Sequence, residues 1–437
     1  MINKSENSFH FIDNLEKTYQ AINSKRPQWL AQQCQKNLTR LLEAGLPTIK
    51  DEEWKYTNIK SIADHTYAVP EHPKGSFHDL LGDLCSPTEI SVVFVNGKLA
   101  SHLSNFTGAT KLKISSLEEA IADPKNNLEP LFNTFDPKQA NVFVSLNEAL
   151  TEEGVLIQVP EKFSVDKLIH IIHLTTDNKR NILSVPRTII ALGKLAQAAV
   201  LETHISPHHG SIYLASPLTD ILVSEGAVVK YCKAQSESAN AFHMGTTRVW
   251  QERDSNFNGF SMMNGAKITR NNLDIILNGE GASGTLNGLY CVNDAQHVDN
   301  HTCVDHRVPN CTSNQLYKGI LNGSSRAVFN GKIFVRAIAQ KTNSYQLNKN
   351  LLLGKDCRVD TKPQLEISAD DVKCTHGATI GQLNEDEIFY LRSRAIAKRT
   401  AIKMLSKGFV DEIINHIENE SISQRLNKLL EPTFAAL

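Results

Sequence analysis

The sequence lacks an excess of charge of either sign. Its 46 Lys and Arg residues stand against 47 Asp and Glu residues, so the formal net charge is −1. Nucleic acid is held by a basic field, and the composition therefore predicts no nucleic-acid partner. No window reaches the roughly 18 apolar residues that a membrane-spanning helix needs. Residues 1–20 resemble neither a secretory leader nor a transit peptide. We therefore expect no membrane contact and a cytoplasmic location.

Paired cysteine motifs are missing as well. The eight cysteines are dispersed along the chain and none forms a CxxC pair. Without export signals this usage predicts reduced thiols rather than a disulfide framework. The sequence also has no Walker A motif, so any ATP chemistry must come from a partner. The glycine-rich "GEGASG" at 279–284 precedes a strand-like run, where a dinucleotide site needs a helix, and we interpret it as a turn.

Long helical patterns are absent from the middle of the chain. From Gly154 to Gln382, short β-branched runs alternate with turns rich in Gly, Asn, Asp and Ser. No helical pattern of about 10 or more residues interrupts them, which excludes a βαβ architecture and leaves a sandwich, a propeller or a β-helix. The turns recur at irregular spacing, and this favours a β-helix with loops of variable length over identical propeller blades.

Helical periodicity is confined to the two ends. Apolar residues recur at three- and four-residue spacing from Phe11 to Glu43, and short helical pieces return within 116–150. "ISVVFVNGKL" at 90–99 predicts a hairpin with an Asn-Gly turn. Asn384 begins a helical tail in which a second helix follows the first. We thus expect a mainly helical region at 1–153, a β-helix core at 154–383 and a C-terminal helical domain at 384–437.

Two stretches carry residues that could bind metals or partners. Residues 291–311 contain three cysteines and three histidines, yet their spacing fits no zinc finger or ribbon. In a regular strand His301 and Cys303 would point to one side and His306 to the other, so we expect ordinary buried or surface residues. In "EEWKYT" at 52–57, Trp54 could anchor a partner or tuck the linker onto the core.

Cys374 and His376 in "VKCTHGAT" are two positions apart. On a strand they would project from the same face, which is what a shared pair of metal ligands requires. The alternative is a buried thiol beside a histidine that satisfies a local hydrogen bond, because cysteine is often buried. Their position in the last strand before the helical tail, where a solenoid would meet a cap or a partner, favours the ligand pair.

Four segments together resemble the SufB/SufD family of iron–sulfur cluster assembly proteins. They are "LPTIKDEEWKYTN" at 46–58, "DNHTCVDHRVPNCTSNQLYKGIL" at 299–321, "SRAVFNG" at 325–331 and "NLLLGKDCRVDTKPQLEISADDVKCTHGATIGQLNEDEIFYLRSRAI" at 350–396. The similarity extends over nearly the whole chain. The form "CTHGATIGQL" and the moderate length resemble the SufD branch, since SufB is longer and carries a "CEHEAT"-type sequence at this place. SufB is the nearest alternative.

This resemblance implies a right-handed parallel β-helix with helical regions at both ends. It implies a non-catalytic scaffold subunit that pairs with a SufB-like chain through the β-helices and holds a SufC-like ABC ATPase through its C-terminal helices. A homodimer is the alternative for the isolated chain. Cys374 and His376 would then face the SufB-like partner and supply thiolate and imidazole to a transient iron–sulfur cluster, with Cys374 either a ligand or a sulfur relay. Two ligands fall short of the usual four, so the partner must complete the site.

Two other classes of protein compete with this hypothesis. A β-helix carbohydrate-active enzyme would need clustered acids and stacking aromatics, but aromatic residues make up only 7% of the chain. A purely structural adaptor would bind the ATPase without any residue touching iron. Replacement of His376 separates this adaptor from a scaffold that bears a site.

Overall fold

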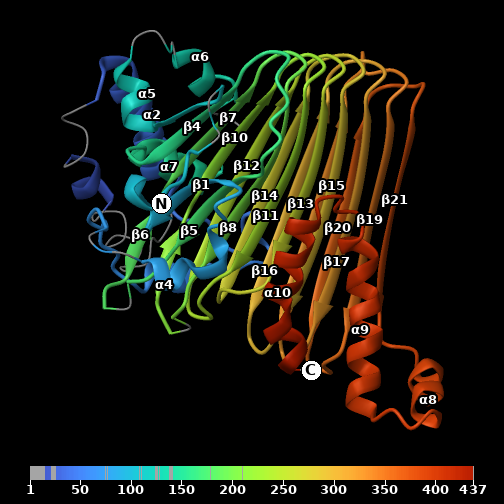
Figure 1. The fold of residues 1–437 in the computed structure, drawn as a ribbon. Coiled ribbons are helices and arrows are strands. Elements are labelled where there is room, and N and C mark those ends of the chain that lie inside the picture. Colours follow the sequence, from blue (N-terminus) through green and yellow to red (C-terminus); the bar gives the residue numbers. More distant parts are fainter. Residues whose placement is uncertain are drawn as a thin grey trace.

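The computed structural model describes residues 15–20 and 26–436, except 74, 76, 108, 110, 124–125, 127, 137–140, 178 and 209. Figure 1 shows a long stack of strands with helices gathered at its N-terminal end, and with α9 (Lys398–Ile414) and α10 (Glu420–Ala436) of the C-terminal segment along one side. The helical expectation for Phe11 and Ile12 falls outside the described residues.

The strands form two large sheets, and the chain alternates between them. The first sheet has ten strands in the order β2 (Lys98–Leu99), β1 (Ile90–Val95), β5 (Ile169–Leu174), β8 (Gln197–Ile205), β11 (Val228–Ser236), β13 (Asn256–Met263), β15 (Ser283–Val292), β17 (Thr312–Leu321), β19 (Asn343–Leu352) and β21 (Lys373–Gly381). The second has eleven, namely β20 (Arg358–Ile367), β18 (Arg326–Val335), β16 (His297–His306), β14 (Ile268–Leu277), β12 (Phe242–Gln251), β10 (Leu218–Val223), β7 (Arg187–Leu192), β4 (Gly154–Val159) and β3 (Lys113–Ser116), with β9 (Tyr213–Ala215) beside β12 and β6 (Ile182–Ser184) beside β9.

The pairing is parallel except at β1–β2 and β3–β4. Each turn of the chain therefore adds one strand to each sheet, which is a parallel β-solenoid. Apolar side chains from both inner faces, such as Ile157 and Val200, share one continuous core. The fold is thus mainly β with helices at both ends. The β-helix prediction is confirmed, and the sandwich and propeller alternatives are excluded. β1 joins the first sheet although it precedes the expected core boundary at 154.

The two turns predicted from the sequence are present in the structure. Asn96 and Gly97 both have positive φ, 53° and 82°, as the tight hairpin between β1 and β2 requires. "GEGASG" turns the chain from β14 into β15. A Cβ on Gly279 would lie 1.9 Å from the backbone nitrogen of Arg253 in the neighbouring turn, so only glycine fits there. The interpretation of this motif as a turn is confirmed.

Two N-terminal helices cover the outer face of the eleven-stranded sheet. Leu30, Cys34 and Leu41 of α2 (Gln28–Ala44) pack with α7 (Val142–Leu150) and with Ile189 of the sheet. The other short helices are α3 (Lys60–Ala63), α4 (His78–Leu81), α5 (Leu117–Ala122) and α6 (Glu129–Phe132), with 3₁₀ turns at Glu52–Trp54, Gly82–Leu84 and Ser101–Leu103.

Trp54 is buried in the same layer, with the Arg270 guanidinium 3.9 Å above its ring. Arg270 also donates a hydrogen bond to the Glu53 carbonyl at 2.7 Å. Of the two alternatives for "EEWKYT", the structure therefore shows the one in which Trp54 fixes the linker to the solenoid.

The C-terminal tail forms α8 (Glu385–Ser393), α9 (Lys398–Ile414) and α10 (Glu420–Ala436). The Asn384 side chain caps α8 by accepting the Asp386 N–H, as expected of a helix start. Ile413 of α9 and Leu426 of α10 pack on Cys232 and Leu289 on the outside of the ten-stranded sheet. The helical tail is confirmed, and α10 is an additional helix that the sequence did not indicate. Among the described residues, no helix is long and apolar enough to cross a membrane.

Candidate functional site

Cys374 and His376 lie on β21, the last strand of the ten-stranded sheet. β21 pairs with β19 on one side, and the described chain provides no strand on its other side. β20 ends the eleven-stranded sheet in the same way. Figure 1 places β21 at the end of the stack farthest from the N-terminal helices. The two residues are thus at an uncovered end of the solenoid.

The register places both side chains on the inward face. Cys374 follows Ser344 and His376 follows Gln346, and those two β19 residues are buried inside the solenoid. Side chains that stack on this inward face are hydrogen-bonded from one turn to the next. The Ser344 hydroxyl lies 2.7 Å from the Ser313 hydroxyl, and the Gln346 side-chain amide donates to the side-chain oxygen of Gln315 at 3.2 Å. The predicted same-face geometry is confirmed.

The environments of the two side chains differ. Cys374 is half-buried and packs beside Ile333, Val335 and Ala339, whereas His376 is exposed. Burial raises the pKa of the Cys374 thiol, and a backbone hydrogen bond from Ser344 acts in the opposite direction. The thiol is therefore protonated near neutral pH, and it becomes a ligand or a nucleophile when a metal or a charged partner displaces its proton.

The same end exposes apolar side chains that the other turns bury. Inward positions on β18, such as Phe329 and Ile333, are buried, but the next residue in the Ile333 column, Leu365 on β20, is only half-buried. Ile367 and Ile380 are 42% and 48% exposed. β20 and β21 also present one unpaired edge each, which is a template for strands of another chain. This end has the chemistry of an interface.

The histidines and cysteines of 291–311 do not converge on a metal site. His306 faces inward and its Nε2 lies 2.9 Å from the Ser313 hydroxyl, while Cys291 and Cys311 are buried. His301 lies on the outer face, 2.9 Å from Asp299. The expectation that these are ordinary structural residues agrees with the structure.

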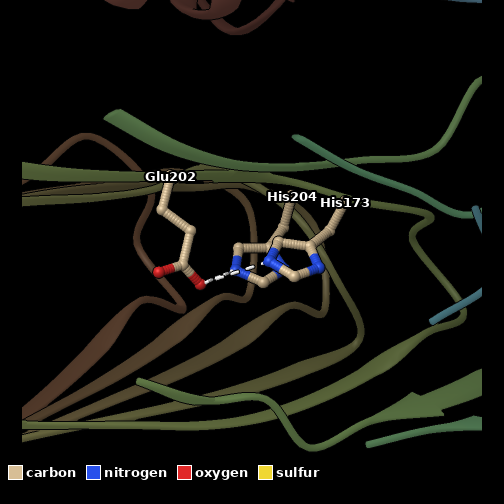
Figure 2. Close-up of side chains that lie close together, drawn as sticks. All are labelled: His173, Glu202 and His204. Carbon is tan, nitrogen blue, oxygen red and sulfur yellow. Dashed lines mark hydrogen bonds and ion pairs between the residues drawn. The ribbon is translucent and has the colours of Figure 1, made fainter. Parts of the chain in front are cut away.

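Sequence reasoning missed a cluster inside the solenoid. Within the described part of the chain, the one group of three or more His, Cys, Asp or Glu side chains with metal-binding spacing is His173, Glu202 and His204, shown in Figure 2. Their candidate ligand atoms lie within 4.8 Å of one another. The sequence offered one signal, the "ETH" triplet with Glu and His at alternate positions of a strand, but nothing in it connects that triplet to His173.

Comparison with known proteins places the chain in a family. The family model described as "SUF system FeS cluster assembly, SufBD core domain" matches residues 173–409. The model described as "SufBD protein N-terminal region" matches residues 5–171. The chain therefore belongs to the SufBD family of iron–sulfur cluster assembly proteins, as the resemblance of its motifs indicated.

Individual relatives are similar over most of their lengths. The chain is 31% identical over 423 residues to the iron-sulfur cluster assembly protein SufD of Escherichia coli (strain K12), covering 96% of both chains. It is 31% identical to the SufBD family protein slr0076 of Synechocystis, covering 88% of this chain and 86% of the relative. It is 29% identical to the chloroplastic protein ABCI7 of Arabidopsis thaliana, covering 87% and 81%. The first two relatives are named as iron-sulfur cluster assembly proteins, and the first agrees with the SufD-like form of "CTHGATIGQL".

Proposed function

We propose that this chain is a SufD-like, non-catalytic scaffold subunit of an ATP-dependent complex that builds and transfers iron–sulfur clusters. The observation that carries the proposal is the placement of Cys374 and His376 together on the inward face of an uncovered solenoid end. All eight cysteines are free thiols, which suits a reducing cytoplasm. The SufB paralogue is the alternative assignment, and the "CTHGATIGQL" form favours SufD.

The uncovered end is the proposed contact with a SufB-like chain. Strand edges on β20 and β21 can continue into strands of the partner, and Ile367 and Ile380 would be buried by it. Cys374 and His376 then supply one thiolate and one imidazole, both of which iron accepts. A cluster normally takes four protein ligands, so the partner provides the rest and the cluster is shared and transient. The same end could pair two copies of the isolated chain.

The C-terminal helices are the proposed contact with a SufC-like ATPase. Phe389 and Tyr390 on α8 are 71% and 58% exposed, and Met404 on α9 is 49% exposed. Exposed large apolar side chains are typical of binding surfaces, and α8 and α9 contact each other. Figure 1 shows α8 standing away from the sheets, beside one end of α9. We name these three residues the α8–α9 patch.

The same helices are firmly attached to the solenoid. Lys318 on β17 donates hydrogen bonds to the Glu412 carboxylate and the Phe409 carbonyl of α9, both at 2.6 Å. Arg425 of α10 holds both carboxylate oxygens of Glu89, at 2.8 and 2.9 Å. Movement of ATPase subunits on nucleotide binding would therefore reach the sheet that carries β21 and open or close the interface.

Reconstitution tests the shared cluster. The chain alone, and the chain co-purified with a SufB-like and a SufC-like protein, are treated with iron and sulfide without oxygen. Because two ligands cannot hold a cluster, we expect cluster absorbance on the complex and little on the lone chain. The measurement is the visible absorption spectrum with iron and sulfide content. A full, stable cluster on the lone chain would contradict a shared site.

A double replacement, Phe389→Ala with Tyr390→Ala, tests the α8–α9 patch. Loss of two exposed aromatic anchors should weaken ATPase binding by about 10-fold or more, since buried aromatics dominate interface energy. Leu195→Ala is the matched control, because Leu195 is 48% exposed and lies in the turn between β7 and β8 and not on a C-terminal helix. Binding is measured by titration calorimetry. If the double variant and the control bind the ATPase with equal affinity, the ATPase binds at a surface other than the α8–α9 patch.

A further inference from the structure

A histidine and glutamate cluster lies inside the solenoid, far along the stack from Cys374. Its residues are His173 on β5 and Glu202 and His204 on β8, which are 7%, 0% and 2% exposed. His173 and His204 are neighbours in the register of the two strands, and Glu202 shares the inward face with His204. In Figure 2 the two imidazole rings lie one over the other, beside the Glu202 carboxylate.

The two oxygens of Glu202 have different roles. Oε2 accepts hydrogen bonds from the Tyr231 hydroxyl at 2.6 Å and the Thr219 hydroxyl at 2.8 Å. Oε1 lies 2.8 Å from Nε2 of His204 and 3.6 Å from Nε2 of His173. One oxygen is therefore fixed by its neighbours, and both imidazoles approach the other.

His173 makes no hydrogen bond that the described residues supply. Both of its ring nitrogens are buried without a partner. The ring is stacked between Phe94, at 4.8 Å between centroids, and His204, at 4.3 Å. Burial lowers the pKa of His173 well below 6.5, so the ring is neutral and has a free lone pair. Burying two ring nitrogens without hydrogen bonds lowers the stability of the fold, and buried polar groups are normally paired. An apolar side chain would fill the same space without this loss of stability.

We propose that His173, Glu202 and His204 bind one divalent first-row transition ion within the solenoid. The two ring planes are 3° apart, so at least one imidazole rotates out of the stack to bring both Nε2 lone pairs onto the ion. Two imidazoles and one carboxylate are the ligand set that proteins use for Zn²⁺ and for Fe²⁺ with open coordination positions. Tyr231 and Thr219 would orient the ligating carboxylate from behind, as outer hydrogen bonds do in metal sites. The proposal rests on this cluster alone and is independent of the function proposed for Cys374 and His376.

Further buried charged groups lie beside the cluster. Glu237 adds a second buried carboxylate, and its Oε2 lies 2.6 Å from Nδ1 of His243. The buried Lys233 carries a charge of the opposite sign, and it acts electrostatically on both Glu202 and Glu237.

Metal content after refolding is the direct test. The chain carrying Cys374→Ala and His376→Ala, which removes the end site, is refolded from denaturant with excess Zn²⁺ or Co²⁺ and freed of unbound ion. We expect one ion per chain by mass spectrometry, a higher Tm than without metal, and cobalt absorption bands typical of nitrogen and oxygen ligands. Refolding is used because the cluster is enclosed, and binding then couples to folding.

His173→Phe is the discriminating variant. It keeps a ring between Phe94 and His204 but removes the lone pair. Loss of a residue that only hydrogen-bonds a metal ligand costs up to about 100-fold in affinity, so loss of the ligand itself should lower the ion affinity by about 100-fold. The metal-free variant should be at least as stable as the parent, because no unsatisfied nitrogen remains. His416→Ala, at an exposed histidine, should keep the ion.

Two results would overturn the proposal. One is a parent chain that retains no Zn²⁺ and shows no cobalt bands after refolding. The other is a His173→Phe chain that retains as much ion as the parent. The first needs no variant, so the proposal stays testable even where His173→Phe does not fold.

Discussion

Replacing His376 by alanine is expected to abolish cluster formation on the assembled complex while leaving the complex intact. His376 is exposed on β21, at the end of the solenoid, and exposed substitutions usually change stability by less than about 0.5 kcal/mol. The loss would therefore come from the missing imidazole donor and not from unfolding. The measurements are activation of a cluster-dependent enzyme in cells and cluster absorbance of the purified complex.

Thr375→Ala is the matched control for this prediction. Thr375 is the next residue on the same strand and is also exposed, but it projects from the opposite face. It should support normal maturation. If the His376→Ala complex matures clusters as well as the Thr375→Ala complex does, the chain is a purely structural adaptor and the pair at 374 and 376 is an ordinary thiol and histidine.

Replacing Asp220 by alanine is expected to lower the free energy of unfolding by about 3–5 kcal/mol. Asp220 accepts hydrogen bonds from Arg187 at 2.8 Å and from Arg248 at 2.6 Å, and all three side chains are buried. Its removal leaves two guanidinium groups to share the remaining carboxylate, Glu148. Breaking a buried ionic network in this way is costly because a charge remains without compensation.

This loss should depend on pH in a defined direction. Burial by itself would raise the pKa of Asp220, but Arg248 and Arg187 outweigh it and hold the pKa below its ordinary value of 3.8. A carboxyl with a lowered folded-state pKa contributes stability above its unfolded-state pKa and loses it as the pH falls through the folded-state pKa. The difference between parent and Asp220→Ala should thus be full near neutral pH and shrink in acid below about pH 4.

Urea unfolding measures both effects. Glu225→Ala is the control, since Glu225 pairs with Lys194 at 3.0 Å but both side chains are about half exposed. Such pairs are worth about 1 kcal/mol or less. A loss for Asp220→Ala no larger than that of the control would show that the buried network is not needed to hold the N-terminal helices against the sheet.

Local chemistry was readable from the sequence because it depends on neighbours along the chain. The Asn96-Gly97 hairpin, the turn at "GEGASG" and the cap at Asn384 were all predicted and confirmed. The same-face relation of Cys374 and His376 also needed only the two-residue period of a strand. α10 lies within the expected helical tail but was not predicted as a separate helix, and its apolar residues pack on the sheet.

The sequence by itself determined the β texture, the turns, the helical ends and the family to which the motifs belong. The tertiary structure alone decided which residues meet across turns. His173 and Glu202 are separated by a full turn of the solenoid, so their approach depends on loop lengths and register rather than on any motif. The exposure of His376 depends likewise on the absence, within the described chain, of a further strand beside β21. Periodicity fixes the direction of a side chain, whereas its neighbours depend on how the strands stack.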